Sequence, residues 1–167
     1  MEAVKMDRQP KRPVFLTVLG ILSLITIGFG ILSSVLGLLS GPMSAADLEA
    51  TLAGSAQSAQ QLQEMGESEW AETIFKIMQL AVYTNANFYT DKLLNLGIYS
   101  LGFVGVVSML KGRKLGFHLY IIYNILSLFS IYASAPIDQV PTFYLGLFGV
   151  IATIFVFLYS RNLKWLK

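Results

Sequence analysis

The sequence contains no cysteine, a single histidine and few charged residues. Without cysteine the chain cannot form a disulfide, a thiolate nucleophile, a cysteinyl zinc site or an iron–sulfur cluster. Charged residues make up 13% of its 167 residues, against about 25% in an average soluble protein. Hydrophobic residues make up 54%, so a water-soluble fold would expose a large apolar surface. These proportions predict an integral membrane protein.

Long apolar runs account for this composition. A membrane-spanning helix needs roughly 20 apolar residues, and the apolar positions here are continuous rather than alternating, which favours helices over a β-barrel. The first run exceeds the roughly 7–15 apolar residues of a signal peptide, so we expect it to be retained. Four runs are long enough to span a bilayer: 14–39, 93–110, 115–133 and 143–160.

Positive and negative charges are segregated along the chain. Apart from Lys76 and Lys92, the basic residues lie in three segments that four spans place on one side: Lys5, Arg8, Lys11 and Arg12; Lys111, Arg113 and Lys114; Arg161, Lys164 and Lys167. Apart from Glu2 and Asp7, every acidic residue lies in the two remaining loops. Basic residues are retained on the cytoplasmic side of membranes. Both termini are therefore predicted to be cytoplasmic.

The predicted organisation is a single all-α membrane domain, 1–167, built as a four-helix bundle. Residues 1–13 form a basic cytoplasmic N-terminus, and the long segment 40–92 lies outside the cell or in the periplasm. A cytoplasmic loop, an outer loop and a cytoplasmic tail complete the chain at 111–114, 134–142 and 161–167.

The long outer loop is expected to contain two helices. Ser44 followed by Asp47 is typical of a helix N-cap and predicts a helix over 45–65, which Gly66 ends. A second, amphipathic helix follows from residue 68 towards 85, and its apolar face carries Trp70, Ile74, Ile77 and Met78. This face is expected to lie at the membrane interface or on the spans; docking a partner and gating a substrate are the alternatives.

The start of the second span has two interpretations. Thr90 is a candidate helix cap, and Asp91 suits a helix N-terminus. The amphipathic helix continuing without a break into the span is the alternative.

Small and polar residues within the spans are candidates for helix contacts. Association of helices in lipid depends on close approach and interhelical hydrogen bonds. Asn124, near the middle of its span, is expected to bond to another helix. The positions predicted to pack helices or to contact a partner are Ser23, Gly30, Gly37, Gly97, Gly105, Asn124, Gly146 and Gly149.

Residues suited to catalysis are scarce. His118 is interpreted as an interfacial polar residue, and Glu69 and Glu72 as part of a solvated acidic face. We predict no catalytic residue, no metal site, no cofactor and no nucleic-acid binding. Basic residues are instead expected to set the topology and to contact lipid headgroups: Lys11, Arg12, Lys111, Arg113, Lys114, Arg161 and Lys164.

Two stretches resemble known membrane proteins. Arg12–Pro13–Val14–Phe15–Leu16–Thr17–Val18–Leu19 and Met109–Leu110–Lys111–Gly112–Arg113–Lys114–Leu115–Gly116–Phe117 are similar to segments of small uncharacterised four-span proteins of bacterial inner membranes. The resemblance implies a bacterial inner-membrane setting and carries over no catalytic residue. The plan also resembles eukaryotic tetraspan junction proteins, but their loop cysteines are absent here.

The sequence therefore predicts a non-enzymatic accessory or structural subunit of a larger membrane protein complex, with the lipid bilayer and a membrane-protein partner or a second copy as its contacts. An oligomeric channel or a carrier of a small molecule or lipid is the alternative. Its polar path would include Asn95, Asn124, Ser127 and the tyrosines of the third span. An enzyme is the third interpretation, and it would depend on Glu69, Glu72 or His118.

Overall fold

The computed structural model describes residues 12–167, and this part of the chain is helical with no β-strand. Its elements are α1 (Val14–Ser40), α2 (Ala45–Glu64), α3 (Ser68–Ala86), α4 (Phe88–Leu110), α5 (Lys114–Phe129), the short 3-10 helices η1 (Ser130–Ala133) and η2 (Ile137–Gln139), and α6 (Thr142–Ser160). Helices α1, α4, α5 with η1, and α6 are long and apolar enough to cross a membrane. The predicted all-helical fold with four long apolar helices is confirmed for the described residues, and four candidate spans indicate an integral, multi-pass membrane protein.

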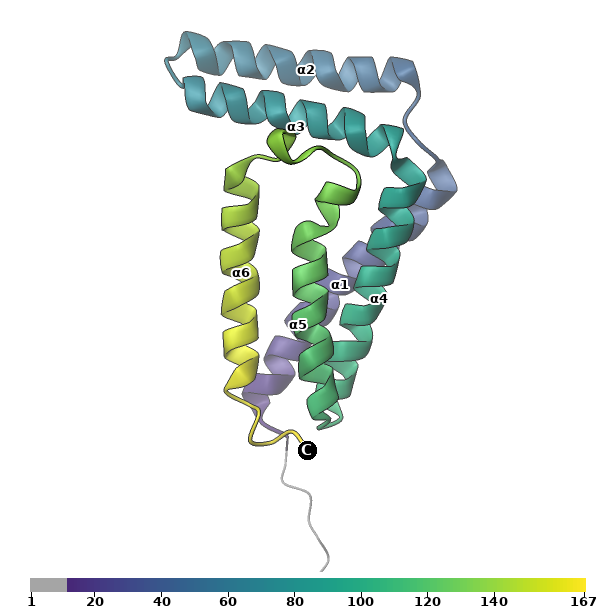
Figure 1. Ribbon diagram of the computed structural model, residues 1–167, viewed down its shortest axis with the longest axis vertical. Coiled ribbons are helices and arrows are strands. Elements are labelled where there is room, and N and C mark those ends of the chain that lie inside the picture. The colour runs from purple at the N-terminus through teal and green to yellow at the C-terminus, as the bar shows by residue number, and fades with distance from the viewer. Residues whose placement is uncertain (1–11) are drawn as a thin grey trace, which may run out of the picture.

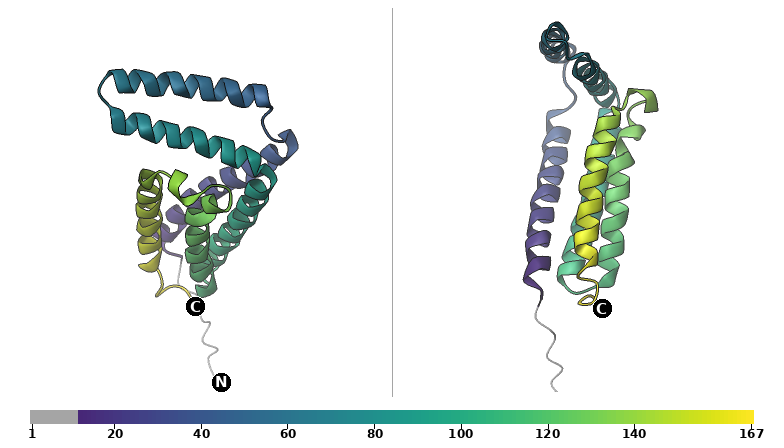
Figure 2. Two further views of the ribbon diagram at one scale, coloured as in Figure 1. Left: turned by 45° about the horizontal axis from the view of Figure 1, so that its top comes forward. Right: turned by 90° about the vertical axis from the view of Figure 1, so that its left-hand side faces the viewer.

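The four apolar helices run along the long axis of the molecule, and α2 and α3 form a hairpin across one end (Figure 1). Helix α4 packs between α1 and α5, whereas α6 makes much less contact with its neighbours. We call the end covered by α2 and α3 the hairpin end. The opposite end, where α1 begins and the chain terminates (Figures 1 and 2), is called the basic end.

Local sequence signals explain how the hairpin forms. The Ser44 hydroxyl accepts a hydrogen bond from the Asp47 amide at 3.2 Å and donates one to the Asp47 carboxylate at 2.6 Å. The predicted cap at the start of α2 is therefore confirmed. Gly66 adopts a φ of 84°, which residues with a side chain rarely adopt, and this lets α3 turn back along α2.

The junction between α3 and α4 differs from the capped start at Thr90. Only Asn87 separates the two helices, and α4 begins at Phe88, so Thr90 lies inside a helix. The Asp91 amide donates to the Asn87 carbonyl at 2.9 Å. No proline or glycine lies between 87 and 92, so the helix of the span extends back from the apolar run at 93 to Phe88. The unbroken helix of the alternative is also not found, because the chain leaves the helical conformation at Asn87 and α3 and α4 run in different directions (Figure 1).

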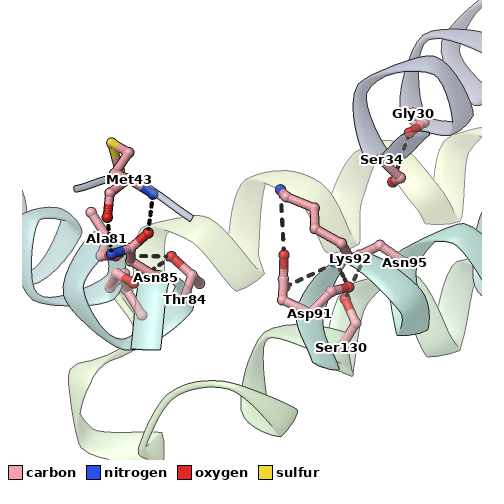
Figure 3. A network of polar contacts seen from close by, with 11 residues as sticks. Gly30, Ser34, Met43, Ala81, Thr84, Asn85, Asp91, Lys92, Asn95 and Ser130 are labelled. Atoms are coloured by element: carbon pink, nitrogen blue, oxygen red, sulfur yellow. Dashed lines mark hydrogen bonds and ion pairs between the residues drawn. The ribbon is translucent and has the colours of Figure 1, made fainter. Parts of the chain in front are cut away.

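One contact closes the base of the hairpin, and a second joins the hairpin to α6. The Met43 amide donates to the Asn85 side chain at 2.8 Å, and that side chain donates back to the Met43 carbonyl at 3.2 Å (Figure 3). Further along α3, the Trp70 ring meets the edge of Phe143 in the first turn of α6, with ring centroids 5.9 Å apart. The hairpin is thus tied at its base to the linker that follows α1 and along α3 to the start of α6.

The best-packed part of the protein lies toward the basic end. Large side chains that are almost completely buried gather there from all four spans, including Leu16, Val106, Met109, Phe117 and Tyr159. The half of the bundle nearer the hairpin end is less tightly packed between α1, α5 and α6.

Candidate functional site

A cavity of about 360 Å³ opens between the spans. This volume is within the range of about 300–1,000 Å³ that small-molecule sites occupy. Its lining combines aromatic rings, aliphatic side chains and hydroxyl groups, and none of the described residues that line it is charged. We call it the tyrosine cavity, and its lining residues are Ser23, Thr26, Ile27, Tyr99, Tyr120, Tyr123, Asn124, Ser127, Leu128, Tyr144, Phe148, Ile151, Ala152 and Phe155.

A hydrogen-bonded cluster closes the cavity toward the basic end. The Tyr159 hydroxyl donates to Ser23 Oγ at 3.0 Å, and the Tyr120 hydroxyl lies 3.3 Å from the same atom. The rings of Tyr120 and Tyr159 meet edge to face with centroids 4.7 Å apart. Because Ser23 is on α1, Tyr120 on α5 and Tyr159 on α6, this cluster joins three spans at that end of the cavity.

Two glycines make room for the tyrosines of the wall. A Cβ on Gly30 would lie 2.6 Å from the ring of Tyr99, and a Cβ on Gly102 would lie 2.6 Å from the ring of Tyr123. The rings of Tyr99 and Tyr123 are in turn 6.3 Å apart. Close approach by small residues therefore brings aromatic rings from α4 and α5 to the same wall.

Three hydroxyls of this wall have no partner. Within the part of the chain that the structure describes, Tyr99, Tyr123 and Tyr144 form no hydrogen bond through their hydroxyl groups. These hydroxyls are not fully enclosed, since Ser134 Oγ is the one fully buried side-chain nitrogen or oxygen without a partner among the described residues, so they can be reached from the cavity. The cavity is therefore the place where an acceptor from outside the chain would be stabilised.

Asn124 and Ser127 line the cavity as the channel-or-carrier alternative predicts. The Asn124 side chain donates to the Tyr120 carbonyl at 2.7 Å, one turn earlier in the same helix. The hydrogen bond to another helix expected for Asn124 is thus replaced by an intrahelical one, because the cavity leaves no facing backbone within reach. Asn95 does not line this cavity.

Asn95 instead belongs to a second, polar hollow at the hairpin end, about 340 Å³ in volume. Its side chain donates to the Asp91 carbonyl at 2.9 Å and to the Asp91 carboxylate at 3.0 Å. Lys92 lies 3.5 Å from the same carboxylate (Figure 3). Tyr99 and Tyr144 line both this hollow and the tyrosine cavity, so the two spaces adjoin.

Three of the predicted packing glycines lie at contacts within the chain. Gly30 faces Tyr99, and a Cβ on Gly37 would lie 3.1 Å from the Lys92 side chain. A Cβ on Gly105 would lie 3.1 Å from the backbone of α5. Its counterpart on α5 is Gly116, which sequence reasoning missed. A signal was available, because Gly116 is a small residue in the first turn of the span that follows the short turn at residues 111–113.

The other predicted packing glycines have no such contact. A Cβ on Gly97 or Gly146 would meet nothing within 4 Å among the described residues, and a Cβ on Gly149 would meet only Leu128, at 3.8 Å. For Gly97 and Gly146, the predicted contact with a partner stays a prediction.

The predicted basic positions, as far as they are described, gather at the basic end, and Lys11 lies outside the described residues. The Lys114 amide donates to the Lys167 carbonyl at 2.9 Å, and the Lys167 amide donates to the Gly112 carbonyl at 2.6 Å, so the tail pairs with the α4–α5 turn. A hollow of about 470 Å³ lies there. Arg161 and Lys164 are exposed outside it, while its charged lining comprises Arg12, Lys111, Arg113 and Lys167.

The apolar face predicted for the amphipathic helix α3 is partly used. Trp70 contacts Phe143, Ile74 and Met78 are half-buried, and Ile77 is exposed. The apolar face of α3 therefore contacts the start of α6 through Trp70 and is exposed at Ile77.

The residues considered for catalysis lie apart. His118 is exposed, and its Nδ1 lies 3.1 Å from the Lys114 carbonyl. Glu72 pairs with Lys76 at 2.9 Å on the surface of α3. No group of three or more His, Cys, Asp or Glu side chains that could hold a metal ion occurs in residues 12–167.

Comparison with known proteins gives no family for this chain. No protein-family model, curated protein or solved structure matches it.

Proposed function

We propose that this chain is a non-enzymatic accessory or structural subunit of a larger membrane protein complex. The observation that supports this proposal is that three glycines of the spans would meet nothing within 4 Å if they carried a Cβ: Gly28 on α1, Gly97 on α4 and Gly146 on α6. In lipid, glycine weakens a helix slightly and contributes most where a second helix approaches closely. Open glycine positions on three spans suit a helix from another chain, either a partner protein or a second copy.

The light packing of α6 supports the same proposal. Among the residues of α6, all of which the structure describes, Tyr159 alone is buried. The other spans each bury several side chains. A span that contacts its own chain mainly through one end has a surface available to a partner along the rest of its length.

A substitution at Gly146 tests the proposal. We expect Gly146→Leu to reduce the partner protein recovered after gentle detergent extraction by about tenfold, because the added side chain occupies the space for the partner helix. The melting temperature of the chain itself should not change, since nothing lies within 4 Å of the new Cβ. Quantitative mass spectrometry of the co-purified proteins, with native mass spectrometry for a second copy, measures the effect.

The matched control is Gly54→Leu, which makes the same change on α2 at a position that also has nothing within 4 Å. It should retain the partner at the wild-type level. A wild-type chain recovered as a monomer without any partner would contradict the accessory role.

We further propose a bacterial inner-membrane location with the basic end in the cytoplasm. The described basic residues of the loop and tail lie at that end, and the acidic hairpin lies at the other. This distribution agrees with retention of Lys and Arg on the cytoplasmic side. The bacterial setting is supported only by the resemblance of the sequence to small four-span proteins of bacterial inner membranes. With the basic end in the cytoplasm, α2 and α3 cover the end of the bundle that faces away from the cytoplasm.

Single-cysteine labelling tests the orientation, and the cysteine-free chain makes it clean. We expect Ser58→Cys, on the exposed surface of α2, to react with a membrane-impermeant maleimide in intact cells. Lys164→Cys at the basic end should react only after the cells are opened. Labelling in the reverse order would show that the hairpin faces the cytoplasm.

The tyrosine cavity favours a second candidate function, a carrier of a small molecule or lipid. A channel through one chain is disfavoured because the Ser23–Tyr120–Tyr159 cluster closes the cavity at the basic end. Flux of a small molecule into liposomes that contain only this protein would support a carrier.

A further inference from the structure

We propose that the tyrosine cavity binds the uncharged, flat headgroup of a quinone-type lipid. This inference deepens the second candidate function, because it names the ligand of the same cavity. It concerns binding alone and involves no electron transfer by this chain.

The charge of the ligand follows from the lining. No described residue of the wall is charged, and the neighbouring Asp91 and Lys92 pair with each other at 3.5 Å. A charged ligand would lose its hydration without gaining a counter-charge, which is costly at membrane depth. An uncharged molecule dissolved in the bilayer enters without that cost.

The polar groups of the ligand follow from the hydroxyls. Tyr99, Tyr123 and Tyr144 supply unpaired O–H donors in the described part of the chain. Such donors are satisfied by acceptor oxygens. A quinone headgroup carries two carbonyl oxygens, and the hydroxyl donors that could bind them come from α4, α5 and α6.

The shape of the ligand follows from the aromatic walls. Rings contribute to the lining from α4, α5 and α6, and the Tyr120 and Tyr123 centroids are 5.6 Å apart. Aromatic side chains favour offset or edge contacts with another flat ring. Phe148 and Ile151 line the cavity while also being exposed on α6. The cavity is therefore open on the side where an apolar tail would extend into the lipid.

Binding to the full-length protein in phosphatidylcholine nanodiscs tests the inference, with decylubiquinone as the probe. We expect the quinone to raise the melting temperature and to saturate. Tyr123→Phe and Tyr144→Phe should each weaken binding by about three- to tenfold, the effect of one lost hydrogen bond. Because these variants remove only a hydroxyl, they keep the shape of the wall. Tyr132→Phe, outside the cavity, should bind like the wild type.

A second pair of variants tests the place of binding. Ala152→Phe fills the cavity and should abolish binding, whereas Val150→Phe, on the exposed side of α6, should leave it unchanged. Equal binding by both variants would overturn the proposal. So would failure of decylubiquinone to bind the wild type.

A competition experiment with a second lipid distinguishes a quinone from other sources of acceptor oxygens. Diacylglycerol offers ester carbonyls without a flat ring, and we expect it not to displace the quinone at an equal mole fraction. Displacement would overturn the quinone assignment in favour of a glycerolipid. Saturable binding without flux in liposomes would leave the inference standing and refute the carrier. Because the chain is tested alone, none of these results bears on the accessory role.

Discussion

Replacing Gly116 with alanine should destabilise the protein more than any other single-methyl change. The added Cβ would lie 2.5 Å from the Gly105 carbonyl oxygen and 2.9 Å from the Met109 side chain. Overpacking typically costs about 1–3 kcal/mol, and we expect a loss of about 3 kcal/mol because a backbone carbonyl of α4 cannot move aside as a side-chain tip can. Reversible unfolding in mixed detergent micelles measures the change.

Gly97→Ala is the matched control for this prediction. It adds the same methyl group to α4, but nothing lies within 4 Å of the new Cβ. Alanine is favoured over glycine inside a helix by about 1 kcal/mol, so the control should be as stable as the wild type or more stable. Equal stability losses in the two variants would show that α4 and α5 do not meet at Gly105 and Gly116.

Replacing Tyr159 with alanine should release α6 from the other spans. Tyr159 is fully buried, with 0% of its surface exposed. Truncating a buried aromatic side chain costs about 3–5 kcal/mol. Because α6 buries no other side chain among its described residues, the lost stability is that of the contact between α6 and the other spans. Spin labels on α1 and α6 should report a broadened distance distribution.

Tyr159→Phe separates packing from hydrogen bonding. It keeps the ring against Tyr120 but removes the 3.0 Å bond to Ser23. Polar bonds between membrane helices contribute about 0.6 kcal/mol on average, so this variant should keep α6 in place. If the phenylalanine variant released α6 as fully as the alanine variant, the hydroxyl rather than the ring would hold the helix.

The helix-packing positions show how far sequence reasoning reached. Gly30 and Gly105 were predicted to lie at helix contacts because small residues in a span permit close approach, and both do. Gly116 was missed, although it meets the backbone of α4 as Gly105 meets the backbone of α5. Asn124 was expected to form a hydrogen bond to another helix, yet its side chain donates to the Tyr120 carbonyl of its own helix. The presence of a polar side chain in a span predicts that it needs a partner but does not identify that partner.

The number of spans, the segregation of charge and the cap at Ser44 follow from the order of residues along the chain. Hydropathy over about 20 residues decides which segments prefer lipid, and a cap depends on atoms only three residues apart. The tyrosine cavity depends on rotation and spacing of whole helices. Tyr99, Tyr123 and Tyr144 meet at one wall because glycines let α1, α4 and α5 approach closely while α6 packs mainly near the basic end. These distances between segments far apart in the chain are set only when the helices pack.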